Sequence, residues 1–258
     1  MQLDLLPICT NLNESFLIAL LMNVFIILII SAVAVFFGRW LSNIKAVRSK
    51  DRHHVILGFT TGMLAMLTFG EIFSEALDLP FWGLSFILVG MVLGWLMFKK
   101  HNHANTHSDE IGVNKMFRVI GIFIHSVFDG FGLAVIYSIS HALFFAGLIA
   151  FFAHRVNDGF TGSVILRKKA VSPRVIRNTA VLNAISPMIG VLLFYLLDGL
   201  VSYEYAICIG SALAFGFFFS LIRYELVPEI LQEEHPVLPT LISVLVGVVA
   251  MYTLILIS

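Results

Sequence analysis

Apolar residues fill eight stretches of the chain, each about 20 residues long, and short polar segments separate them. An α-helix of that length crosses the hydrocarbon core of a bilayer. The pattern therefore predicts an all-α polytopic membrane protein with eight transmembrane helices in a single domain, residues 1–258. The predicted helices cover residues 16–38, 55–77, 81–98, 116–138, 142–166, 176–198, 206–231 and 237–257.

Composition agrees with this pattern. Hydrophobic residues make up 59% of the 258 positions and charged residues 12%, with a mean hydropathy of +0.95, which excludes a water-soluble globule. The formal net charge of zero gives no sign of nucleic-acid binding. The sequence contains no phosphate-binding glycine loop, catalytic triad or zinc-protease motif, so we expect that the protein is not an enzyme.

The basic residues predict how the helices are oriented. Fourteen of the sixteen Lys and Arg residues lie in or beside three loops: the loop after the first predicted helix, the loop between the third and fourth, and the loop after the fifth. In the predicted topology these three loops lie on the same side of the membrane. The positive-inside rule assigns this side to the cytoplasm, so both termini are expected outside it. The absence of targeting segments favours a bacterial plasma membrane (inner membrane). The other two basic residues, Arg155 and Arg223, lie within predicted helices.

A repeated heptapeptide, His-x-Val-x-Asp-Gly-Phe, provides the candidate chemistry. It occurs at residues 125–131 and again at 154–160, on two predicted helices that are antiparallel neighbours. In each copy the His and the Asp are four residues apart, so they share one helix face. Both copies fall near the middle of a span, where an ionisable side chain is costly and is a functional candidate by default. The four candidate ligands are His125, Asp129, His154 and Asp158.

Two imidazoles and two carboxylates suit a first-row divalent cation. Four glycines close to the ligands are expected to let the helix backbones approach, so that short side chains can converge: Gly130, Gly132, Gly159 and Gly162. An alternative is that His and Asp only join the helices by hydrogen bonds.

A second repeated pattern, Glu-x-x-x-Glu-x-Leu, lies on the second and seventh predicted helices and contains Glu71, Glu75, Glu225 and Glu229. Because these helices run in opposite directions, the pattern predicts two inverted three-helix repeats around the central antiparallel pair, as in alternating-access transporters. The glutamates would then line an outer entrance and an inner exit. They could equally be solvated residues at helix ends.

Three histidines lie in the predicted cytoplasmic loop, residues 99–115: His101, His103 and His107. They could accept a metal ion that leaves the protein on that side. A solvated linker explains them as well.

These features together resemble the ZIP family of divalent-metal transporters over essentially the whole chain. The resemblance includes the helix number, the outside termini, the histidine-bearing loop and both His/Asp motifs. It extends to the Phe-Thr-Thr-Gly-Met stretch at 59–63, to Pro187 with Gly190, and to Pro228-Glu229.

The resemblance implies transport toward the cytoplasm of zinc, or of a related ion such as iron, manganese or cadmium, and the inverted repeat predicts that this transport proceeds by alternating access. It implies the four motif residues as ligands, with Met63 close to them, and no cofactor besides the transported ion. The expected partners are this ion and the lipid bilayer. A second copy of the chain, in a homodimer, is a further possible partner.

The sequence departs from the family pattern at two positions. The family usually has Asn and Glu after the motif histidines, where they serve a second metal, but this chain has Ser126 and Arg155. A guanidinium stays protonated and cannot bind a cation. Our hypothesis is that Arg155 takes the place of the second metal and neutralises Asp158 or Asp129, which leaves a single-metal site. In the alternative, Arg155 pairs elsewhere, for example with Glu225.

Ser126, Arg155 and Asn157 are therefore the positions expected to modulate the site. Two other functions remain open. A metal sensor would keep the fold and the binding site without transport. An electron-transfer protein would use the two motif histidines as axial ligands of a haem, but would leave both aspartates unexplained.

Overall fold

The computed structural model describes residues 14–44, 50–78, 82–103, 113–168, 172–231 and 237–257, and within these residues it is helical and contains no strand. Its elements are α1 (Glu14–Leu41), α2 (Lys50–Leu67), η1 (Thr68–Ile72), α3 (Phe73–Leu77), α4 (Trp82–His103), α5 (Val113–Ile139), α6 (His141–Lys168), α7 (Pro173–Leu200), α8 (Tyr203–Leu221), η2 (Ile222–Leu226), α9 (Val227–Ile230) and α10 (Val237–Ile257). Each range predicted as a span coincides closely with one helix, or with a continuous rod in which a π-helical turn, η1 or η2, interrupts an α-helix.

Five of the described helical segments are long and apolar enough to cross a membrane, which indicates an integral membrane protein. They are Val24–Leu41, His54–Leu77, Pro173–Leu200, Tyr203–Leu226 and Leu238–Ile257. Two shorter apolar segments lie in α4 and α5. α6 belongs to neither group, because polar residues of the second heptapeptide interrupt its apolar stretch.

Large apolar side chains cover the outer faces of the bundle. On α10, for example, Leu238, Leu241, Ile242 and Leu245 are all exposed. In contrast, the largest side chain with no exposed surface in the described residues is that of Arg155. This distribution, apolar outside and charged inside, suits a protein surrounded by lipid.

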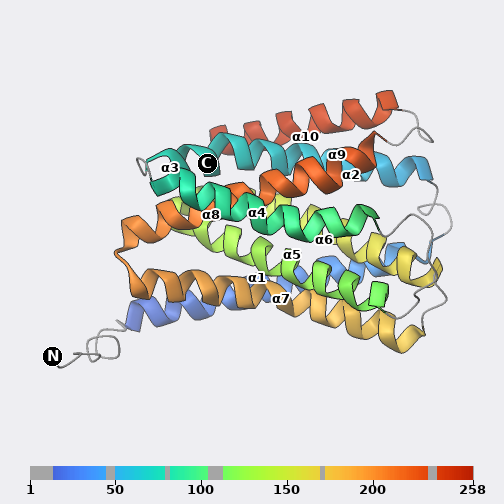
Figure 1. Ribbon diagram of the computed structural model, residues 1–258, viewed down its shortest axis with the longest axis horizontal. Helices are drawn as coiled ribbons and strands as arrows, with labels where there is room; N and C mark the ends of the chain where they lie inside the picture. Colours follow the sequence, from blue (N-terminus) through green and yellow to red (C-terminus); the bar gives the residue numbers. More distant parts are fainter. Residues whose placement is uncertain are drawn as a thin grey trace.

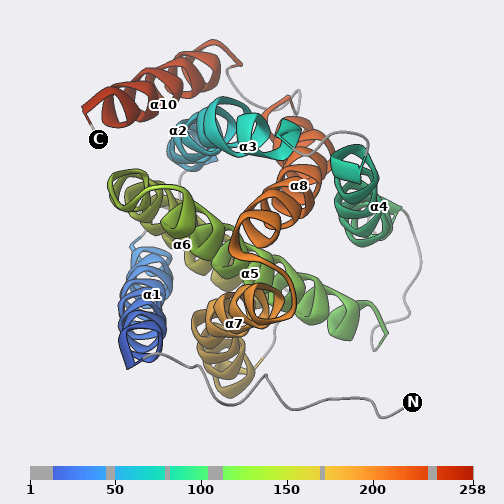
Figure 2. The ribbon, with the colours of Figure 1, turned by 90° about the vertical axis from the view of Figure 1, so that its left-hand side faces the viewer.

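The helices form three layers (Figures 1 and 2). α5 and α6 make the central layer, with α1 and α7 packed on one side and α2, α4, α8 and α10 on the other. The main contacts are α5 with α7, α6 with α1, α2 with α10, and α4 with α8. The start of α1 and the end of α10 lie at the same end of the bundle (Figure 1).

Reciprocal glycine contacts join α5 to α7. A Cβ atom at Gly130 would collide with the backbone oxygen of Pro187, and one at Gly190 would collide with the backbone oxygen of Val127. Both helices therefore need a glycine at the point where their backbones touch.

α6 contacts α1 in the same way, through Gly159 against Val35 and Gly38 against Val156. The sequence led us to expect that the motif glycines bring α5 and α6 together. Gly130 and Gly159 instead bring each central helix against its outer neighbour, whereas Gly132 faces the ring of Phe218 on α8 and Gly162 has open space beside it.

Reciprocal contacts of this kind also join the helices on the other side of the central pair: Gly62 with Val244 and Gly247 with Phe59 between α2 and α10, and Gly216 with Ile87 and Gly90 with Leu213 between α8 and α4. Close approach at small residues is a common way for helices to associate in membranes, where lipid supplies no hydrophobic driving force.

Candidate metal centre

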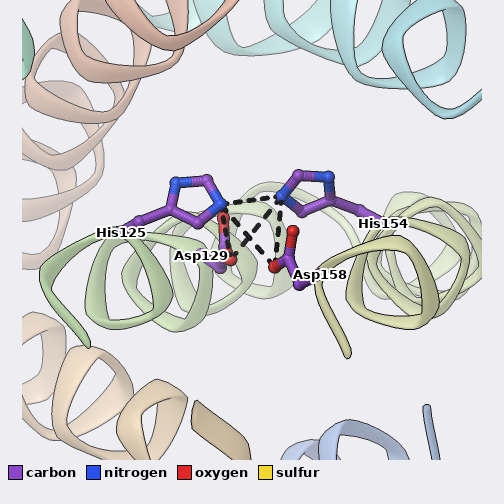
Figure 3. A group of neighbouring side chains, drawn as sticks. All are labelled: His125, Asp129, His154 and Asp158. Atoms are coloured by element: carbon purple, nitrogen blue, oxygen red, sulfur yellow. Dashed lines mark hydrogen bonds and ion pairs between the residues drawn. The ribbon is translucent and has the colours of Figure 1, made fainter. Parts of the chain in front are cut away.

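The two copies of the heptapeptide face each other across the central layer. α5 presents His125 and Asp129, and α6 presents His154 and Asp158, with all four side chains pointing into the space between the helices (Figure 3). One donor atom from each residue lies within 4.8 Å of all the others. The i,i+4 spacing in each copy therefore places the four predicted ligands in one cluster.

Distances within the cluster suit a small cation. The four separations between an imidazole Nε2 and a carboxylate Oδ2 are 3.5, 3.7, 3.8 and 3.9 Å. Tetrahedral zinc, with bonds of about 2.0–2.2 Å, holds its donors about 3.4 Å apart. The two imidazole nitrogens are closer, at 2.8 Å, and have to separate slightly to bind one ion together. The donors are otherwise already in position.

A fully buried guanidinium, that of Arg155 on α6, lies beside this cluster. Its Nη1 is 3.1 Å from Oδ2 of Asp158 and 3.4 Å from Oδ2 of Asp129. Of the two orientations considered from the sequence, the structure contains the one in which Arg155 faces both aspartates.

Three further groups surround the guanidinium. Nη1 donates to Ser126 Oγ at 2.8 Å, and Nη2 donates to Ser31 Oγ at 3.3 Å and to the backbone oxygen of Asn183. Ser126 Oγ in turn donates to Oδ1 of Asn183. Arg155 is therefore held by oxygen atoms from four helices, α1, α5, α6 and α7.

Sequence reasoning missed Ser31 and Asn183. Both are buried polar residues in otherwise apolar helices, and the only signal in the sequence is this polarity at a buried position. Neither belongs to a motif.

The remaining predicted residues lie outside the cluster. Met63 is buried in the apolar core on α2, and its closeness to the ligands stays a prediction. Asn157 is buried on α6, and its side-chain oxygen has no hydrogen-bond partner among the described residues. The four glutamates lie on η1, α3, η2 and α9: Glu71, Glu75, Glu225 and Glu229.

The predicted histidine loop begins later than expected. α4 continues to His103, so His101 and His103 lie in its last turn, whereas His107 lies outside the described residues. The prediction ended this helix where the apolar residues end, but polar residues can extend a helix beyond the hydrocarbon core of the membrane.

The two sides of the cluster differ in access. Phe217 on α8 stacks on Phe128 with ring centroids 3.9 Å apart, and also lies against His125, at 6.3 Å. Phe217 therefore packs against the α5 copy of the motif, while the two histidine side chains are about equally exposed, 10% for His125 and 7% for His154.

Beside the α6 copy is a small cavity of about 20 Å³, which holds roughly one water molecule. Asp158, Asn183, Ser163 and Thr179 supply its polar lining. The side chain of Asp158 is accordingly 16% exposed, against 3% for Asp129. The cavity continues from the cluster toward the end of α6 and the start of α7, where the basic segments lie.

The cluster can hold a metal ion through two nitrogens and two oxygens inside a helical membrane protein. Comparison of the chain with protein-family models and with curated proteins gives no match. The geometry of the buried His/Asp cluster is thus the feature that indicates function.

Proposed function

We propose that this protein transports a divalent transition-metal ion, zinc in the first place, across a membrane toward the cytoplasm, and that it is a member of the ZIP family. The observation that carries the proposal is the cluster of two imidazoles and two carboxylates between α5 and α6. His125 and His154 are each close to the middle residue of their helix. Ionisable groups at that depth are costly and mark ion pathways in membrane proteins.

An inverted repeat of α1, α2 and α4 against α7, α8 and α10 is part of the proposal, with eight membrane-spanning rods in total. The reciprocal glycine contacts support it, because α1 contacts α6 through Val35 and Gly38 as α7 contacts α5 through Pro187 and Gly190. The π-helical turns support it too, since η1 and η2 occupy corresponding places on α2–α3 and α8–α9. Inverted repeats with a site at mid-depth are typical of secondary transporters.

The basic segments and the cavity support the proposed direction of transport. The basic end of the bundle is assigned to the cytoplasm by the positive-inside rule, which leaves both termini outside. The residues that line the cavity beside Asp158 extend toward that end, which supports water entry, and replacement of the ion's ligands, from the cytoplasmic side. In this scheme Glu71 and Glu75 lie on the outer half of the path, and Glu225 and Glu229 on the inner half.

The haem alternative fits the geometry poorly. Axial ligands lie on opposite faces of a haem, about 4 Å apart for metal–nitrogen bonds of about 2.0 Å. The imidazole nitrogens are 2.8 Å apart and both face the same two carboxylates. A single ion between four donors suits this arrangement better than a macrocycle does.

Zinc uptake into proteoliposomes tests the proposal. We expect uptake by the wild-type protein and competition from iron, manganese or cadmium ions. His125→Ala and Asp158→Ala should abolish uptake, because each removes one of four ligands. His141→Ala is the matched control, since His141 is exposed at the start of α6. Zinc binding without uptake would contradict transport and favour a sensor, whereas the absence of zinc binding would contradict both.

A further inference from the structure

Two neighbouring cation positions share the aspartates of the cluster. Oδ2 of Asp129 is 3.5 Å from His125 Nε2 on one side and 3.4 Å from Arg155 Nη1 on the other. Oδ2 of Asp158 is likewise 3.7 Å from His154 Nε2 and 3.1 Å from Arg155 Nη1. The same two oxygens therefore face an imidazole-lined position and a position filled by the guanidinium.

The second position has the surroundings of a cation site. Besides the two carboxylates, its donors are the Ser126 and Ser31 hydroxyls and the Asn183 backbone oxygen, and no surface of Arg155 is exposed. All of these groups are oxygen atoms, which hard cations prefer. A guanidinium in a protein stays protonated, so its charge in this position is permanent.

Arg155 adds one positive charge to the cluster, and this changes the net charge of both the empty and the metal-loaded states. Two carboxylates and one guanidinium give the empty cluster one net negative charge when both imidazoles are neutral, and a bound divalent ion changes this to one net positive charge. Without Arg155 the loaded cluster would be neutral. Since a net charge in a buried site is costly, Arg155 disfavours the loaded state.

We propose that Arg155 is a built-in competitor of the transported ion. Its guanidinium occupies the second cation position, limits the centre to one mobile divalent ion, and lowers the affinity for that ion so that it can leave. This inference depends on the proposed function, because it concerns the same site and the same ion.

A purely structural role for Arg155 makes a different prediction. Arg155 joins four helices, so its replacement will lower thermal stability under either interpretation. Only a competitor role predicts that removing the charge strengthens metal binding. Zinc affinity and the number of zinc ions per chain therefore separate the two roles, and the melting temperature does not.

The experiment is calorimetric titration of the purified full-length protein in detergent with zinc. Arg155→Gln should bind zinc at least about tenfold more tightly than the wild type, because it removes a like charge close to the ion. Arg155→Lys retains the charge and should retain the wild-type affinity. Arg155→Glu should bind a second zinc ion per chain.

Arg223→Gln is the matched control, since Arg223 is also an arginine in the interior of a predicted span but is exposed beside Tyr224. It should bind zinc as the wild type does. If Arg155→Gln does not fold, Asn183→Asp tests the same idea, because it keeps Arg155 and adds a carboxylate beside it. This variant should also bind zinc more tightly than the wild type.

The two proposals fail in different ways. A wild-type protein that binds no zinc contradicts the proposed function. A wild-type protein that binds zinc through the four ligands, together with folded Arg155→Gln or Asn183→Asp variants that bind it no more tightly, overturns the role of Arg155 alone. The same holds if Arg155→Glu still binds a single zinc ion.

Discussion

The heptapeptide copies on α5 and α6 are alike in their ligands and differ in their surroundings. Both contribute a His and an Asp to the cluster, and both place a glycine against an outer helix. The α5 copy has Ser126 after its histidine and packs against the ring of Phe217. The α6 copy has Arg155 in the corresponding place and lies beside the cavity.

In the proposed function, this difference separates two tasks within one site. The positions that the copies share contribute the His/Asp cluster and the helix contacts, so they would determine whether an ion can bind. The positions that differ change the net charge of the cluster and the exposure of its aspartates. A pair of related segments could thereby hold an ion symmetrically and still release it in one direction.

Removing a shared histidine should have the largest effect, and it should be equal for the two copies. His125→Ala and His154→Ala should each weaken zinc binding by more than about hundredfold, because losing a ligand costs more than the roughly 10–100-fold lost with an outer-shell partner. Calorimetric titration with zinc measures this loss. A large loss in only one variant would show that the copies do not contribute equally.

Exchanging the residues that differ should have a smaller effect. Ser126→Arg adds a second guanidinium and should weaken zinc binding by at least about tenfold. Adding Arg155→Ser should restore most of this loss, because in the proposed repeat Ser31 and Asn183 occupy corresponding places and can exchange roles around the new guanidinium. Such a recovery of zinc affinity would show that positions 126 and 155 are energetically coupled, because the effects of substitutions at independent sites add.

The matched control is Arg155→Ser alone, which should bind zinc more tightly than the wild type. The proposed two-fold relation would be contradicted if the double variant bound zinc as weakly as Ser126→Arg.

The third effect concerns the helix contacts of each copy. Gly130→Ala and Gly159→Ala should each destabilise the protein by about 1–3 kcal/mol, as overpacking does, because the new Cβ meets a backbone oxygen that cannot move aside. Gly162→Ala is the control, since no atom lies within 4 Å of its added Cβ. Thermal unfolding in detergent measures the difference. Equal stability of Gly130→Ala and Gly162→Ala would contradict the close contact with α7.

The sequence predicted the helices and the members of the His/Asp cluster because both depend on local patterns. Long apolar stretches determine where helices form, and the i,i+4 spacing in two copies determines which side chains share a face. The four residues of the cluster could therefore be named before any contact between the helices was known.

The surroundings of the cluster could not be predicted in this way. Ser31 contacts Arg155 across 124 positions of sequence, and neither its helix nor Asn183 carries a motif. The greater exposure of Asp158 depends on how α1 and α7 pack beside α6, which no local pattern specifies. The prediction also assigned Gly130 and Gly159 to the wrong contact, because small residues indicate close packing but not the partner helix.

The smallest effect expected is a difference in chemical access between the two copies. In a protein with Cys9 and Cys208 replaced by serine, Gly162→Cys places a thiol in the lining of the cavity, where an added Cβ has open space. Leu133→Cys is the matched control, because Leu133 is the equivalent residue after the α5 motif and is 3% exposed.

A small water-soluble thiol reagent should modify Gly162→Cys faster than Leu133→Cys, and zinc should slow the reaction, because the ion binds Asp158 in the wall of the same cavity. Mass spectrometry of the intact protein measures both rates. Equal rates would mean that water reaches the two copies alike, so the different exposure of the two aspartates would not define a release route. If Gly162→Cys reacted faster and zinc had no effect on its rate, the cavity would not be part of the path of the ion.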